Sequence, residues 1–106
     1  CYKDISELSD IQKKAVLCFW YDAEMCSGGH SGYFDNCPED DPDEVYEALL
    51  EIGNKDIADN YRKALTAEAE EDNYIETDNA FYSFSPELAH LLQEYVENNK
   101  KYIFGG

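Results

Sequence analysis

The sequence predicts an all-α fold, a compact single domain of about four main helices that spans residues 1–106. Apolar residues recur at the i, i+3, i+4, i+7 spacing of helices along most of the chain, and the alternation typical of strands is nearly absent. Residues 41–44 (DPDE) and 85–87 (SPE) each place a capping side chain before a proline, as many helices do at their start. The hydrophobic content of 43% is enough for a real core.

The first helix is expected at about residues 6–25 and is expected to be the central one. Its apolar stripe continues into a second half that is apolar nearly all round, so it should be buried on most sides. The residues of this helix are Leu8, Ile11, Ala15, Cys18 and Met25 on the stripe, with Val16, Leu17, Phe19 and Trp20 beside it. Gly28 and Gly29 are expected to end the helix and to open a glycine-rich, aromatic loop.

The second helix is expected to begin at Pro42, with Asp41 as its cap, and to end at Gly53. Two acids in its first turn should stabilise the helix, because they lie at the positive end of its dipole. Its predicted inner face consists of Val45, Ala48, Leu49 and Ile52.

Two further helices and a loop are expected after Gly53. One helix should cover residues 55–69, with Ile57, Ala58, Tyr61, Ala64 and Leu65 inward. The last should start at Ser85 and Pro86, with Leu88, Leu91, Leu92, Tyr95 and Val96 inward and Lys100 and Lys101 near its end. Between them, residues 70–84 are expected to form a polar loop anchored by Tyr74, Phe81, Tyr82 and Phe84.

Charge is the most unusual property of this sequence. Twenty-four acidic residues against eight basic ones give a formal net charge of −16. Such a chain repels nucleic acid and anionic membranes, so neither is expected as a partner. The partners that this charge favours are cations, basic peptides or the DNA-facing surfaces of other proteins. The alternative is that the charge serves solubility alone.

The four cysteines are too few for a disulfide scaffold. Cys18 lies in the most apolar stretch and is expected to be a small buried hydrophobe. Cys26 and Cys37 flank the predicted loop, and a bond between them is open from the sequence. Reduced thiols and a cytoplasmic location are the expectation.

No metal or cofactor is expected. Cys26, His30 and Cys37 have the wrong spacing for zinc, which prefers short repeated intervals and four ligands. The acids near Asp40 lack the alternating register of a calcium loop. The glycines lead into acids rather than toward a basic residue, which opposes phosphate binding.

No catalytic residues are expected either, and the protein is predicted not to be an enzyme. Cys26 or Ser27 with His30 resembles a nucleophile and its base, but no third residue orients the pair. The acidic surroundings should raise the pKa of a thiol there. His30 is therefore expected in a loop, and His90 on a helix surface.

The carboxylates form the strongest candidate site. Residues 35–51 contain eight acids and no base, and residues 68–78 contain six acids and no base. Carboxylates on one face of the second helix would recur every ~5–6 Å, near the spacing of phosphates, which rise ~3.4 Å each along one DNA strand. We define the first acidic block as Asp40, Asp41, Asp43, Glu44, Glu47 and Glu51, and the second acidic block as Glu68, Glu70, Glu71 and Asp72.

Three stretches resemble the bacterial DNA-mimic protein family, a small all-helical domain formerly of unknown function. They are AEMCSGGHSGYFDN, YEALLEIGNKDIADNYRKAL and YVENNKKYIF, and the likeness spans about residues 8–104. The matching positions are Glu24, Gly28, Gly29, Tyr33, Phe34 and Asn36, then Ala48, Leu49, Ile52 and Gly53. Ser27 and His30 depart from the pattern, which usually has asparagine and phenylalanine there. The resemblance implies a helical domain whose best-understood relative is a dimer that occupies a helix-turn-helix repressor.

The function predicted from these observations is a non-catalytic DNA mimic that binds a basic DNA-binding protein, for example a helix-turn-helix regulator of transcription. The chain is expected to form a homodimer, as its relative does. Both acidic blocks are the expected contact surface, while Gly28, Gly29, Tyr33, Phe34, Asn36 and Gly53 are expected to be structural. The alternatives are an immunity or antitoxin-type protein that neutralises a basic toxin, and an acidic helical domain without such a role.

Overall fold

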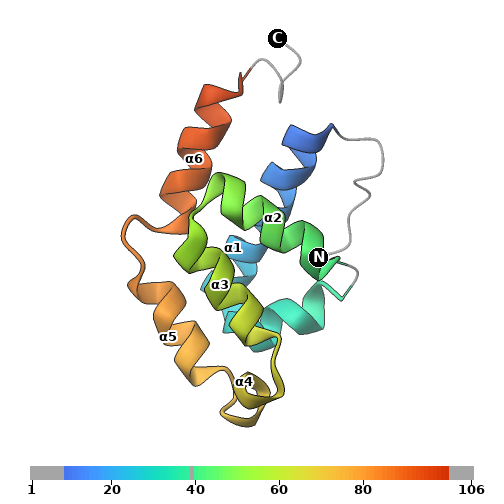
Figure 1. Cartoon of the computed structure of the whole chain (residues 1–106), viewed down its shortest axis with the longest axis vertical. Helices are drawn as coiled ribbons and strands as arrows, with labels where there is room; N and C mark the ends of the chain where they lie inside the picture. Colours follow the sequence, from blue (N-terminus) through green and yellow to red (C-terminus); the bar gives the residue numbers. More distant parts are fainter. Residues whose placement is uncertain (1–8, 39, 101–106) are drawn as a thin grey trace.

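The computed structural model describes residues 9–38 and 40–100, which are helical and contain no strand (Figure 1). Within these residues α1 packs against α2, α5 and α6, and α3 packs against α2, α4 and α5. The all-α prediction is confirmed, but about four helices is too few. The six helices are α1 (Asp10–Asn36), α2 (Pro42–Ile52), α3 (Lys55–Ala64), α4 (Ala67–Glu71), α5 (Ile75–Ser83) and α6 (Leu88–Asn98).

Helix α2 forms where its sequence predicts it. The Asp41 carboxylate accepts a hydrogen bond of 2.9 Å from the backbone N–H of Asp43, Pro42 opens the helix, and Gly53 follows its last residue. All four predicted inward residues of this helix are buried, with 0–4% of their surface exposed. The cap and the apolar stripe are both local features of the sequence, so they are enough to predict this helix.

Helix α1 starts later and runs longer than expected. Ser9 and Gln12 form a capping box in which each side chain accepts a hydrogen bond from the other's backbone N–H, so the helix begins at Asp10 rather than near residue 6. Ser6 and Leu8 lie outside the described residues. The helix then continues to Asn36 instead of ending near Met25, and Phe19 is 55% exposed, so α1 is not buried on all sides.

The glycine pair marks a kink inside α1 rather than a loop after it. Gly29 has φ 66° and ψ −166°, a region that glycine alone occupies readily. A Cβ atom at Gly29 would also collide with the Asp78 carboxylate, whereas one at Gly28 would meet open space. The backbone therefore requires glycine at position 29 and makes no such demand at position 28.

Helix α5 binds the backbone on both sides of this kink. Asp78 Oδ1 accepts a 2.9 Å hydrogen bond from the backbone N–H of His30, the first residue after Gly29. The Tyr82 hydroxyl donates to the carbonyl oxygen of Met25, which precedes the kink. Asp78 and Tyr82 are four residues apart, so they lie on one face of α5. The bend in α1 is thus held by side chains from another helix.

The segment expected to be one long third helix and a polar loop is divided differently. Helix α3 ends at Ala64, Leu65 is 44% exposed rather than inward, and Thr66 caps the short α4 by accepting from the backbone N–H of Ala69. Residues 75–83, expected in a loop, form α5. Thr66, with acids in the turn after it, is a capping signal that the sequence already contained.

Helices α5 and α6 begin without side-chain caps. Asn73 and Tyr74 have φ values of 59° and 62°, so the chain reverses between α4 and α5 through two left-handed residues. Helix α6 begins at Leu88, after Glu87, so Ser85 and Pro86 precede the helix instead of opening it. A left-handed tyrosine at a helix start has no sequence pattern that predicts it, which explains why α5 was missed.

Tyr21 lies at the centre of the core. Its surface is fully buried, and its ring makes edge-to-face contacts with Tyr33, Tyr61 and Phe81 at centroid distances of 5.0, 5.3 and 5.5 Å. These rings come from the second half of α1, from α3 and from α5. Aromatic pairs of this kind contribute roughly 0.5–1.5 kcal/mol beyond their buried area. The core therefore joins three helices through one side chain.

We expect Gly29→Ala to lower the free energy of unfolding by about 1–3 kcal/mol, since alanine is strained in this backbone region and its methyl group would displace Asp78. Urea unfolding at neutral pH measures this change. Gly28→Ala is the matched control, and its stability should equal or exceed that of the wild type because its position is open and helical. Equal stability of the two variants would refute the role assigned to the kink.

Candidate protein interaction surface

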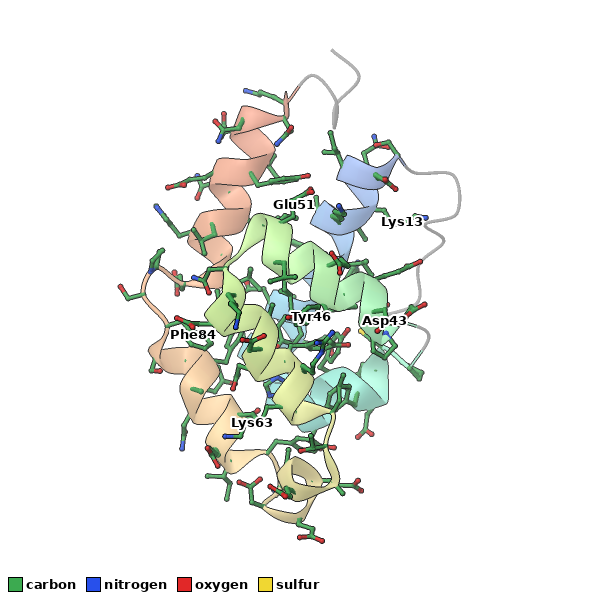
Figure 2. All side chains as sticks on the ribbon, viewed as in Figure 1. Lys13, Asp43, Tyr46, Glu51, Lys63 and Phe84 are labelled. Atoms are coloured by element: carbon green, nitrogen blue, oxygen red, sulfur yellow. The ribbon has the colours of Figure 1, made fainter. Side chains whose placement is uncertain are left out.

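The first acidic block lies along α2 and the turn before it. Asp43, Glu44 and Glu47 are exposed on the helix. Figure 2 labels Asp43 near the start of α2 and Glu51 near its end. Asp40 is partly buried and accepts a 2.8 Å hydrogen bond from the Tyr33 hydroxyl. Asp41 is exposed but serves as the cap of α2. Asp40 and Asp41 therefore also hold the structure together.

Lysines from α1 lie beside this block. Lys14 Nζ is 3.0 Å from Glu51 Oε1, and the Tyr95 hydroxyl donates a 2.6 Å hydrogen bond to Glu51 Oε2. These bonds, first that of Tyr95 and then that of Lys14, lower the pKa of Glu51. Lys13 and Lys14 also line one groove with Asp43, Glu44 and Glu47. The sequence run has no base, but the fold supplies two, and Glu51 is committed to contacts within the protein.

The second acidic block occupies α4 and the residue after it. All four acids, Glu68, Glu70, Glu71 and Asp72, are exposed. Lys63 of α3 forms an ion pair with Glu76 and lines a small hollow with Glu68 and Asp72. Three acids, Glu68, Asp72 and Glu76, therefore share a single lysine among the residues that line this hollow.

In the view of Figure 1, the second half of α1 lies between the start of α2 and α4. The Phe34 ring is 6.5 Å from that of Tyr61 and 5.6 Å from that of Tyr74. Burial, and then the carboxylates of Glu70 and Asp35, raise the pKa of Tyr74. Asp35, which is exposed, therefore acts on the same tyrosine as Glu70 of the second block, and it was not among the residues predicted to bind a partner.

Tyr61 lies near the first acidic block. Burial raises the pKa of Tyr61 to about 12, and the nearby carboxylates of Asp40, Asp41 and Asp43 act in the same direction. Tyr61 and Tyr74 thus each lie near one acidic block, with Phe34 between them. The fold brings the two blocks to either side of one short helical segment.

The residues expected to be structural take varied positions. Tyr33 is 1% exposed, and Phe34 is partly buried against the core. The side-chain amide of Asn36 donates a 2.8 Å hydrogen bond to the carboxylate of Glu24, which lies on the other side of the kink in α1. Gly53 follows the last residue of α2.

His30 is the residue that sequence reasoning placed least well. It is fully buried and not in a loop. Its Nδ1 lies 2.7 Å from Asp78 Oδ1 and its Nε2 lies 2.6 Å from the Tyr21 hydroxyl. Since a carboxylate only accepts, neutral His30 donates from Nδ1 and accepts from Tyr21 at Nε2. We call these residues the Tyr21–His30–Asp78 triad; its carboxylate lies 48 residues from the histidine, so no local pattern predicts it.

The order hydroxyl, imidazole, carboxylate is also that of a catalytic triad, but this one has no access to a substrate. Tyr21 and His30 are both fully buried. Burial, ahead of nearby charged groups, raises the pKa of Tyr21 well above its ordinary value, so the hydroxyl stays protonated. The arrangement serves packing and hydrogen bonding between α1 and α5.

The cysteines do not form the sites considered from the sequence. Cys37 is disulfide-bonded, whereas Cys18 and Cys26 are free thiols. The bond between Cys26 and Cys37 that the sequence left open therefore does not form, and the expectation of reduced thiols is wrong for Cys37. Burial, Asp22 and Glu87 raise the pKa of Cys26, which opposes nucleophilic chemistry. Among the described residues, no group of three or more His, Cys, Asp or Glu side chains is placed to hold a metal ion. In the same part of the chain, no helix is long and apolar enough to cross a membrane.

A comparison with protein families supplies the wider context for these features. The family model of the DMP19-like proteins matches residues 6–99, nearly the whole chain. The chain belongs to the DMP19-like protein family. DMP19 is a DNA-mimic protein family, so the resemblance found from the sequence is confirmed at the level of the family. No curated protein and no solved structure matches the chain. The DMP19-like family is not a known enzyme family.

We expect Asp41→Ala to lower the free energy of unfolding by about 1 kcal/mol, because the cap of α2 is lost. Asp41→Asn removes the same charge but keeps an acceptor oxygen, so its stability should stay close to that of the wild type. Thermal and urea unfolding of the two variants measure the difference. Equal destabilisation by both substitutions would show that the charge of Asp41, and not its capping bond, matters for stability.

Proposed function

We propose that this DMP19-like protein is a non-catalytic DNA mimic that occupies the DNA-binding surface of a transcription factor or another nucleic-acid-binding protein. Family membership supports the proposal. The observation that carries it is the exposure of the acids: of the ten in the two blocks, nine are exposed and Asp40 is partly buried. Exposed carboxylates on rigid helices suit the lysines and arginines of a DNA-binding groove.

The acids do not contribute equally in this proposal. Asp43, Glu44 and Glu47 of the first block, with the whole second block, are the proposed contacts. Asp41 caps α2, and Glu51 binds Lys14 and Tyr95. These two acids therefore contribute more to the negative electrostatic field of the surface than to direct contacts with the partner. Asp35 joins the proposed surface because it is exposed and acts on Tyr74 together with Glu70 of the second block.

The proposed partner is a basic DNA-binding protein, with a helix-turn-helix regulator as the first candidate. Association with a second copy of the chain is also proposed, and the exposed ring of Phe19 on α1, packed edge to face on Trp20 at 5.6 Å, is an available apolar contact. A cytoplasmic location stays a prediction. The disulfide at Cys37 is the feature that opposes it, since such bonds are rare in the cytosol.

The proposal is tested by capture from a host lysate at low salt, elution with rising salt, and identification of the eluted proteins. The expected result is a DNA-binding protein whose capture is abolished by excess duplex DNA. Its affinity should fall steeply with salt, because exposed charges are screened beyond about 8 Å at physiological ionic strength. Affinity that does not change with salt, or a captured protein that still binds DNA when saturated, contradicts the proposal. Capture of a toxin such as a nuclease would favour the immunity alternative.

Paired charge variants locate the contacts. Glu44→Gln with Glu47→Gln should weaken binding of the captured protein at least tenfold and flatten its salt dependence. The control, Glu94→Gln with Glu97→Gln, removes the same charge from the exposed surface of α6 and should change affinity less than threefold. Equal effects of the two pairs would mean that net charge alone, and not this surface, drives binding.

A further inference from the structure

The Tyr21–His30–Asp78 triad joins α1 to α5. Asp78 belongs to α5, which follows α4 after a short reversal, and His30 opens the second half of α1. The carboxylate of Asp78 binds both the ring and the backbone N–H of His30. These bonds attach α5 to the kinked part of α1.

The protonation state of His30 determines whether both ends of the triad are satisfied. Neutral imidazole donates at Nδ1 and accepts at Nε2, which matches Asp78 on one side and the Tyr21 hydroxyl on the other. A protonated ring donates from both nitrogens and can no longer accept from Tyr21. The Tyr21 O–H group, fully buried, then loses its acceptor.

The surroundings of His30 offer little compensation for a positive charge. The titratable groups that face it are Tyr21 of α1, Asp78 of α5 and Tyr74 at the start of α5, whose ring centroid is 6.2 Å away. The other close ring is that of Phe34, at 6.0 Å. The carboxylate of Asp78 therefore favours a protonated imidazole, while the full burial of the ring disfavours it.

We propose that the Tyr21–His30–Asp78 triad is an acid-sensitive clasp, in which proton uptake by His30 loosens the attachment of α5 to the kinked half of α1. The clasp is independent of the proposed function, and its test needs no partner. Helix α4, which carries the second acidic block, directly precedes α5. Loosening of α5 in acid would therefore also change the position of that block relative to α1.

The direction of the effect follows from the pKa of His30. Burial lowers it below its ordinary value of about 6.5, although the Asp78 hydrogen bond and charge oppose this. As the pH falls below about 6.5, the unfolded chain takes up the proton before the folded protein does. Stability is therefore present above this pH and is lost between about 6.5 and the lower folded-state pKa, by at most about tenfold in the folded-to-unfolded ratio per pH unit.

Two measurements on the whole protein test the clasp. In NMR titration of the imidazole signals, His30 should titrate below pH 6.5; a His90→Gln variant assigns the two histidines, since the chain contains no others. Urea unfolding at about pH 7.5, 6.5 and 5.5 should show a loss of stability in the wild type that His30→Phe removes. If His30→Phe does not fold, Tyr21→Phe keeps the Asp78 bonds and should raise the pKa of His30 and reduce the loss.

Amide exchange identifies the element that loosens. After correction for the intrinsic pH dependence of exchange, α2 amides should follow only the loss of global stability that urea unfolding measures. The ratio of α5 opening to α2 opening should be at least tenfold higher at pH 5.5 than at pH 7.5. The proposal is overturned if His30 titrates at or above pH 6.5, if stability is constant over this range, or if α2 and α5 open equally.

Discussion

The kink in α1 at Gly29 is the constraint on which the rest of the structure depends. A helix that continued straight would not place His30 against Asp78 or the second half of α1 between α2 and α4. Only glycine fits the backbone there without strain, and α5 binds the chain on both sides of it through Asp78 and Tyr82. Since Tyr21 packs on rings from the kinked half, from α3 and from α5, the bend and the core depend on each other.

The strong negative charge is divided between structural and exposed roles. Asp41 caps a helix, Asp78 fixes the kink, and Glu51 binds Lys14 and Tyr95. Lysines from outside the two acidic runs lie next to both acidic blocks: Lys13 and Lys14 beside the first, and Lys63 beside the second. The net charge of each run of sequence therefore overstates the negative charge at that surface. What remains is a set of exposed carboxylates on short helices, held apart at positions that the kink determines. This is the physical basis of the proposed mimicry of DNA.

Local features of the sequence predicted the all-α fold and α2, because a cap, a proline and an apolar stripe all occur within residues 41–52. The family could also be recognised from the sequence. The kink was not, because the glycine pair is also typical of a helix end, and α5 was missed because it begins after a left-handed Tyr74 without a cap. Asp78 lies 48 residues from His30, and Lys14 and Tyr95 lie 37 and 44 residues from Glu51. No pattern in a single sequence predicts such pairs.

The backbone amide of His30 offers the most direct test, since in this account its hydrogen is held by the Asp78 carboxylate inside the core. Hydrogen exchange at neutral pH, followed residue by residue with NMR, measures how tightly it is held. The account predicts that this amide exchanges as slowly as the amides of the α2 core, by global unfolding. Rapid exchange through a local opening, with the α2 amides still protected, would contradict the claim that α5 fixes the bend in α1.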